Sequence, residues 1–246
     1  MKKPTLLLVA VIIFITLLSV TLDLLIWWRH FHAGIFENAG LKNGSEILRF
    51  GRTALCGLLI FEIWKNPVSR IDFWLLAGAF GIAIIADYFL ILRHQLITGI
   101  ALFAIMQILL IVRHLQKANF KILNIPVILS AILIGIAMLL FSNFLLHAPL
   151  SSKNLALPVG IYSGLLITSC LAAFAAMHAG FLPKRNARLA FLAMLLFLLC
   201  DITVGVGAAF GEQSFGSLIR AATGIFYTPS LLLLAFSGVT GFNNSR

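Results

Sequence analysis

Five ionisable residues lie within long apolar runs of the sequence. They are three aspartates and two arginines: Asp23, Arg52, Asp87, Asp201 and Arg220. On insertion scales, a charge at the centre of a bilayer is unfavourable by about 2.5–3.5 kcal/mol or more, so such residues usually pair or line a functional cavity. Two carboxyl groups that differ in protonation can share general acid–base work, and arginine binds oxyanions well. The residue types therefore suggest a functional polar cavity inside a membrane, in which carboxyl groups could transfer protons and arginines could bind an anion.

These five residues are predicted to lie at one depth. Asp87 is sixteen residues beyond Ile71, about 24 Å along a helix that rises 1.5 Å per residue, and Asp201 is thirteen beyond Arg188, about 20 Å. Asp23 is near the outer end of the first expected helix, and the two arginines are near the starts of inward-running helices. All five are expected in the outer half of the membrane.

The composition supports membrane insertion. Hydrophobic residues form 61% of the 246 residues, charged residues form 11%, and the mean hydropathy is +1.06, which leaves too little polar surface for a water-soluble domain. Eight apolar runs are candidate membrane-spanning helices, of which the second and fourth are short: 5–27, 50–64, 71–92, 97–112, 124–146, 156–180, 187–209 and 216–239. We therefore expect an all-α membrane protein, with residues 1–246 forming a single integral membrane domain of about eight transmembrane helices.

The basic residues predict the orientation. If the N-terminus is inside, eleven of the eighteen lysines and arginines fall on the cytoplasmic side, which favours N- and C-termini in the cytoplasm. The net charge of +10 is spread over short loops, so it indicates topology rather than a nucleic-acid partner. In a bacterium, this multi-pass protein is expected in the cell (inner) membrane. The longest loop, 28–49, is expected to be a partly ordered outer flap.

Helical spacing predicts which other residues share a helix face with each charged residue. Asp87 follows Ala79 and Ala83 at intervals of four residues, which places it on a small-residue face suited to close helix contact. Asp201 shares a face with Phe197, and Arg220 shares one with Gly224 and Tyr227 of the last helix. Gly99, Phe103 and Gln107 line one face of the fourth helix. An outward-opening polar pocket is one interpretation, and structural ion pairs (Asp87 with Arg52, Asp201 with Arg220) are the other.

Other kinds of site find little support in the sequence. The six histidines form neither H-x-x-x-H nor H-E-x-x-H, and no Gly-rich phosphate loop or G-x-S-x-G motif is present. Cys56, Cys170 and Cys200 fall inside apolar runs and are predicted to be small core residues. The sequence predicts neither a metal site nor an organic cofactor.

Three short motifs resemble a known family. The segment A-D-Y-F-L-I-L at 86–92 is followed by Gly99, Phe103 and Gln107, F-L-L-C-D occupies 197–201, and F-Y-T-P-S occupies 226–230. Their order and spacing resemble the YhhN-like lysoplasmalogenase family from about the second span onward. The resemblance implies an enzyme that cleaves the vinyl ether bond of lysoplasmalogens, with a lysophospholipid as substrate, membrane lipids as surroundings, and Asp87 and Asp201 as the essential residues.

The sequence departs from the family pattern at several positions. Gly51-Arg52-Thr53 stands where the family usually has lysine–proline, so the resemblance implies that Arg52 takes the cationic role. Further departures are Gln107, Leu110 and Ser230.

The implied reaction fits the residue types. Vinyl ether hydrolysis needs a proton delivered to the β-carbon and water that attacks the resulting oxocarbenium ion, as two carboxyl groups do in glycosidases. Asp87 and Asp201 are the candidate pair, in either assignment of roles. Arg52 and Arg220 are candidates for binding the lipid phosphate, and three polar residues are candidates for orienting the substrate: Tyr88, Gln107 and Tyr227.

Two alternatives use the same residues differently. A small proton-coupled transporter would use the carboxylates as proton sites, although no inverted repeat is evident. A non-catalytic lipid-binding protein predicts that the polar residues pair off and leave no cavity.

Overall fold

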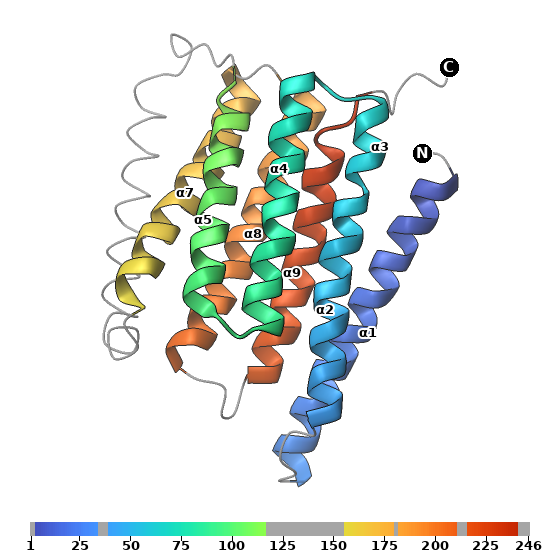
Figure 1. Ribbon diagram of the computed structural model, residues 1–246, viewed down its shortest axis with the longest axis vertical. Helices are drawn as coiled ribbons and strands as arrows, with labels where there is room; N and C mark the ends of the chain where they lie inside the picture. Colours follow the sequence, from blue (N-terminus) through green and yellow to red (C-terminus); the bar gives the residue numbers. More distant parts are fainter. Residues whose placement is uncertain (1–2, 34–38, 117–154, 180–181, 211–215, 241–246) are drawn as a thin grey trace.

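The computed structural model describes residues 3–33, 39–116, 155–179, 182–210 and 216–240. Over these ranges the chain is helical, and the one β-type contact is an isolated bridge between Pro67 and Val239. The elements, shown in Figure 1, are α1 (Lys3–Ala33), α2 (Ala39–Leu58), α3 (Ile60–Lys65), α4 (Arg70–Asp87), the π-helix η1 (Tyr88–Leu92), α5 (Leu96–His114), α7 (Ala156–Ala179), α8 (Lys184–Phe210) and α9 (Gly216–Phe236).

The prediction of an all-helical membrane protein is confirmed in its main features. Six of the described helical segments are long and apolar enough to cross a membrane: Lys3–His32, Arg70–Leu92, Leu96–His114, Leu157–His178, Lys184–Gly207 and Gly216–Phe236. The predicted span 124–146 lies outside the described residues. The total of eight spans and the cytoplasmic position of both termini therefore stay predictions.

The predicted flap at 28–49 is wrong for most of its length. α1 continues to Ala33, and α2 begins at Ala39, so both helices extend past the apolar runs that mark them. Hydropathy detects only residues suited to hydrocarbon, whereas the helical hydrogen-bond ladder continues through a polar segment. The predicted span 50–64 also differs, because it is divided between α2 and α3 by a turn in which the Leu59 amide donates to the Cys56 carbonyl over 3.1 Å.

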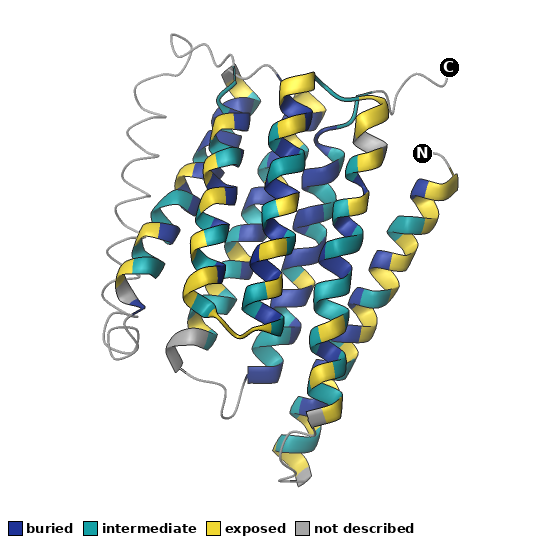
Figure 2. Cartoon of the chain, viewed as in Figure 1, coloured by how far each residue is buried: buried dark blue, intermediate teal, exposed yellow. Residues whose placement is uncertain are grey.

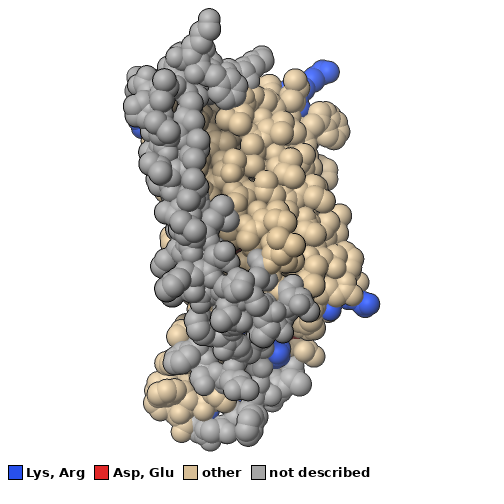
Figure 3. Space-filling model, turned by 90° about the vertical axis from the view of Figure 1, so that its left-hand side faces the viewer, with Lys and Arg blue, Asp and Glu red and all other residues tan. Residues whose placement is uncertain are grey.

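The helices pack side by side in a ring that follows the chain. α1 contacts α2, and contacts continue from α2 to α4, α5, α7, α8 and α9, which returns to α1. The interior is apolar, with Leu76, Phe80, Met106, Met194 and Leu231 fully shielded. Figure 2 shows the exposed residues along the outward faces of the helices. Figure 3 shows a broad described area of this face without charged side chains, between Lys and Arg side chains above and below it, as expected for contact with lipid.

One end of the bundle is fixed by a buried polar network. The Arg113 Nε atom of α5 lies 2.8 Å from Asp72 Oδ1 of α4, and both side chains are completely buried. Arg113 also donates to Ser237 just after α9 over 2.9 Å. The Asn186 side chain of α8 donates to the Ser237 and Val239 carbonyls. These contacts tie four helix ends together and leave the opposite end for the polar residues that the sequence singled out.

Candidate active site

Asp87 occupies the point where α4 changes from an α-helix to a π-helix. The π-turn is closed by hydrogen bonds from the Arg93 amide to the Tyr88 carbonyl and from the Gln95 amide to the Phe89 carbonyl. Such π-turns are often found at functional sites. Gly99 allows α5 to approach closely here, because a Cβ atom at this position would lie 3.0 Å from Leu90 Cδ1.

The Asp87 carboxyl group is held by two hydroxyl groups. Thr53 Oγ1 of α2 donates to Asp87 Oδ2 over 2.6 Å, and Tyr227 Oη of α9 donates to the same oxygen over 2.9 Å. All three side chains are buried. Two elements distant in the sequence therefore fix one carboxyl group at the end of α4.

Arg52 lies beside this group rather than in an ion pair with it. Its Nη1 atom donates to Ser19 Oγ over 3.3 Å, and its Cζ atom lies 6.0 Å from the centre of the Tyr227 ring, a cation–π distance. Among the described residues no ion pair joins Arg52 to Asp87. The alternative prediction of a structural ion pair between them is therefore wrong. Arg52 supports the ring whose hydroxyl group contacts Asp87.

Asp201 is held by a residue that the sequence analysis did not single out. The Tyr162 hydroxyl of α7 donates a hydrogen bond to Asp201 Oδ2. Gln107 of α5 faces the same hydroxyl, although its fully buried amide makes no hydrogen bond of regular geometry. Asp201 itself is only partly buried.

Aromatic contacts bring the two carboxyl groups to one interior region. The Phe197 ring lies one turn from Asp201 on α8 and 5.5 Å from the Tyr227 ring, whose hydroxyl group reaches Asp87. Phe103 of α5 contacts both rings, at 6.0 and 6.4 Å. The same group of rings thus lies between Tyr227, which contacts Asp87, and the α8 turn that carries Asp201.

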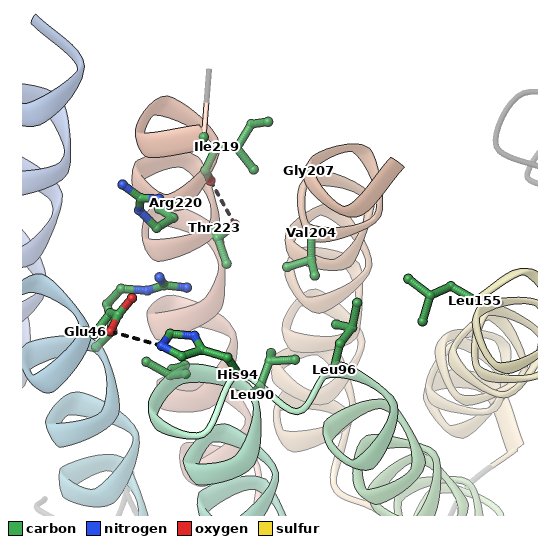
Figure 4. Close-up of a pocket in the computed structure, with 13 residues that line it drawn as sticks. Glu46, Leu90, His94, Leu96, Leu155, Val204, Gly207, Ile219, Arg220 and Thr223 are labelled. Carbon is green, nitrogen blue, oxygen red and sulfur yellow. Dashed lines mark hydrogen bonds and ion pairs between the residues drawn. The ribbon is translucent and has the colours of Figure 1, made fainter. Parts of the chain in front are cut away.

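A cavity of about 380 Å³ opens beyond these residues. Its wall includes Ile91, Val204 and Thr223, which lie three or four residues from Asp87, Asp201 and Tyr227 respectively. One helical turn is about 5.4 Å, so the cavity ends close to both carboxyl groups. Figure 4 shows three polar lining residues, Glu46, His94 and Arg220, on one side of the cavity, whereas Val204, Leu96 and Leu155 lie on the other.

Arg220 is the predicted cationic residue that lines this cavity. Its Nε atom lies 3.4 Å from Asp23 Oδ1, and Asp23 also accepts a hydrogen bond from Ser45 over 2.8 Å. Among the described residues, Arg220 therefore forms an ion pair with Asp23. The alternative prediction of an ion pair between Arg220 and Asp201 is wrong. Arg52 is not among the described lining residues.

Tyr88 stands apart from the other candidates. Its side chain is 39% exposed and contacts the Phe50 and Phe89 rings. Two hydroxyl donors, Thr53 and Tyr162, were missed. Thr53 follows Arg52 directly, and Tyr162 is one of only three tyrosines in the chain, so a search for hydroxyl groups within apolar runs could have found both.

The three cysteines are buried in the helix bundle. Cys56, Cys170 and Cys200 are free thiols and are buried, as predicted. In the described segments, no three His, Cys, Asp or Glu side chains gather where they could hold a metal ion.

The fold and site define a polytopic helical membrane protein with two carboxyl groups beneath a cavity at one end of its bundle. The chain belongs to the YhhN family, whose sequence profile matches residues 49–237. That range contains both aspartates and every hydroxyl group found to contact them, and it confirms the family resemblance. No curated protein and no solved structure matches the chain.

Proposed function

We propose that this protein is a membrane-embedded hydrolase that cleaves the vinyl ether bond of lysoplasmalogens. The observation that carries the proposal is the placement of Asp87 and Asp201, each bound by a tyrosine hydroxyl, next to one cavity of about 380 Å³. The cavity also bears on the non-catalytic alternative, which predicts that the polar residues leave no space for a ligand.

The proposed reaction needs only the two carboxyl groups and water. One aspartic acid donates its proton to the β-carbon of the vinyl ether, which leaves an oxocarbenium ion at the α-carbon. The other, ionised aspartate removes a proton from water as the water oxygen bonds to that carbon. The resulting hemiacetal breaks its bond to the glycerol oxygen, which takes up the proton held by the second aspartic acid. The hemiacetal hydroxyl proton returns to the first aspartate as the carbonyl forms, so the products are a fatty aldehyde and a glycerophospho-headgroup.

The surroundings of the two aspartates support one acting as the proton donor and the other as the base. The hydroxyl groups of Thr53 and Tyr227 fix one carboxyl group, and that of Tyr162 fixes the other, so each can be oriented before substrate binds. The apolar wall of the cavity, with Leu96 and Val204, limits the water that reaches a reactive cation.

Aldehyde release by the purified protein tests the proposal. The substrate is a vinyl ether lysophospholipid in detergent, and the control is the lysolipid with a saturated acyl chain at the same position. We expect aldehyde from the vinyl ether lipid alone. Asp87→Asn and Asp201→Asn should each lower the rate by about 100-fold or more, in the range of general acid–base catalysis.

Protein folding is checked in the same samples. Gel filtration and thermal unfolding of both variants should resemble those of the parent. Parental rates in a folded Asp87→Asn or Asp201→Asn protein would refute the mechanism. If the parent releases no aldehyde but carries protons or lipid into proteoliposomes, the transporter alternative would replace the proposal.

A further inference from the structure

The cavity contains an arginine that the sequence analysis did not consider as a ligand-binding residue. Arg49 of α2 lines the cavity together with Arg220 of α9. Arg49 is partly buried, and its Nε atom is shielded from solvent and has no hydrogen-bond partner among the described residues. A shielded guanidinium N–H group without an acceptor is unfavourable unless a ligand supplies one.

Arg220 is the second arginine among the described lining residues of the cavity. Its side chain is only 11% exposed, and Asp23 holds its Nε atom at 3.4 Å. Asp23 is buried and is not one of the described lining residues, so it orients Arg220 from behind rather than from within the cavity. In the described part of the chain, the Arg52 Nε atom is also shielded and without a hydrogen-bond partner, but Arg52 is not among the described lining residues, and its Nη1 atom donates to Ser19.

Glu46 is the one carboxylate among the described lining residues, and it faces His94 rather than either arginine. Glu46 Oε2 lies 3.8 Å from Nε2 of His94, and Figure 4 shows these two side chains facing each other. The described lining residues therefore carry two arginines against one carboxylate, and this positive balance favours an anionic ligand, although Asp23 behind the wall offsets part of it.

We infer that Arg49 and Arg220 bind the phosphoryl group of an amphiphilic ligand, with Arg49 taking the place that the sequence analysis gave to Arg52. Guanidinium groups suit this ligand because they can form paired hydrogen bonds to phosphoryl oxygens. The inference rests on the proposed function for the identity of that ligand, a lysophospholipid whose phosphoryl group is its headgroup.

Two features favour a lipid headgroup over free phosphate. The side of the cavity opposite Arg220 in Figure 4 is apolar, with Leu96, Leu155 and Val204. The cavity also ends about one helical turn from Asp87 and Asp201. In a lysoplasmalogen, the short glycerol unit separates the phosphoryl group from the vinyl ether. A phosphoryl group at the arginines would therefore leave the vinyl ether near the carboxyl groups.

Binding of a lipid that cannot be cleaved tests this inference independently of catalysis. The ligand is a lysophosphocholine with a saturated alkyl ether chain, and its comparison is the alkylglycerol with the same chain and no phosphate. Affinities in detergent are measured by calorimetry for the parent, Arg49→Gln and Arg220→Gln. Arg93→Gln is the matched control, because Arg93 is exposed just before His94 and does not line the cavity.

We expect Arg49→Gln and Arg220→Gln each to weaken lysophosphocholine binding by about tenfold or more, the size of a lost hydrogen bond to a charged group. Alkylglycerol binding should change less than twofold, as should all binding by Arg93→Gln. Arg49→Lys, which keeps the charge without the fork of donors, should bind with intermediate affinity. Thermal unfolding confirms that each variant is folded.

Three outcomes would overturn the inference. Equal affinity of folded Arg49→Gln and the parent for lysophosphocholine would remove Arg49 from the binding site. Equal losses for lysophosphocholine and alkylglycerol would show that the substitution alters the cavity rather than phosphoryl recognition. Inorganic phosphate that competes as strongly as the lipid would assign the arginines to free phosphate. Absence of aldehyde release, with arginine-dependent lipid binding retained, would refute only the proposed function.

Discussion

The Tyr227 hydroxyl donates a hydrogen bond to Asp87 Oδ2 over 2.9 Å and joins α9 to α4 across 140 positions of the sequence. Thr53 binds the same oxygen from α2, and Arg52 lies against the Tyr227 ring. The position of one carboxyl group thus depends on three helices, and removing a hydroxyl group that holds it is expected to change catalysis more than stability.

Removing the tyrosine hydroxyl tests this dependence. A hydrogen bond to a charged group contributes about 1.5–3 kcal/mol, so Tyr227→Phe should lower kcat for aldehyde release by about 10- to 100-fold. The ring remains and still packs against Phe197, so the thermal unfolding midpoint should change little. Thr53→Val, which removes the second donor, should have a similar effect. An unchanged kcat in both variants would show that the orientation of Asp87 does not limit the reaction.

The Tyr162 hydroxyl should have the same role toward Asp201. Tyr162→Phe is expected to reduce kcat by about 10- to 100-fold for the same reason. KM should be nearly unchanged, because Tyr162 is not a described lining residue of the cavity. Stopped assays over a range of substrate concentrations separate the two constants. A raised KM with a parental kcat would instead indicate that Tyr162 contacts the substrate.

Gly224 provides a test of the arginine beside Asp87. A Cβ atom at this position would lie 2.7 Å from Arg52 Nη1 and 3.1 Å from Val20 Cγ2. Arg52 is 1% exposed and has little room to move, so Gly224→Ala should displace it and destabilise the protein by about 1–3 kcal/mol, as overpacking does. Aldehyde release should fall by about tenfold, the effect of about 1.4 kcal/mol on a barrier.

Gly51→Ala is the matched control for Gly224→Ala. A Cβ atom on Gly51 would meet nothing within 4 Å, and alanine is favoured over glycine within a helix by about 0.5–1 kcal/mol. Gly51→Ala should therefore raise the unfolding midpoint slightly and retain the parental rate. Equal activity in the two variants would argue against a role for the Arg52 position.

The buried ion pair at the far end of the bundle should affect stability alone. Asp72→Asn leaves the fully buried Arg113 without its counter-charge, and breaking such a pair is destabilising by about 3–5 kcal/mol. Thermal unfolding in detergent measures this loss, while the rate per folded molecule should stay near the parental value. The double variant Asp72→Leu/Arg113→Met removes both charges and should recover much of the stability. A double variant as unstable as Asp72→Asn would contradict this explanation.

The sequence by itself determined the helices and the residues that could react. Apolar composition is a local property, so runs such as 71–92 and 187–209 predict membrane helices without knowledge of their neighbours. The unfavourable energy of a charge in hydrocarbon likewise identified Asp87 and Asp201 from their positions alone. For the polar first half of α2 the sequence predicts a loop, and this prediction is wrong because hydropathy does not detect helices outside the membrane.

Only the tertiary structure decided which groups meet. Helical periodicity gives the face on which Thr53, Tyr162 or Arg49 lies, but it does not give the rotation of one helix relative to the next. That rotation is fixed by side-chain packing across the whole ring of helices. It places Tyr227 against Asp87 and Tyr162 against Asp201, and it pairs Arg220 with Asp23. The same packing buries Arg52 behind the site and brings Arg49 to the cavity wall.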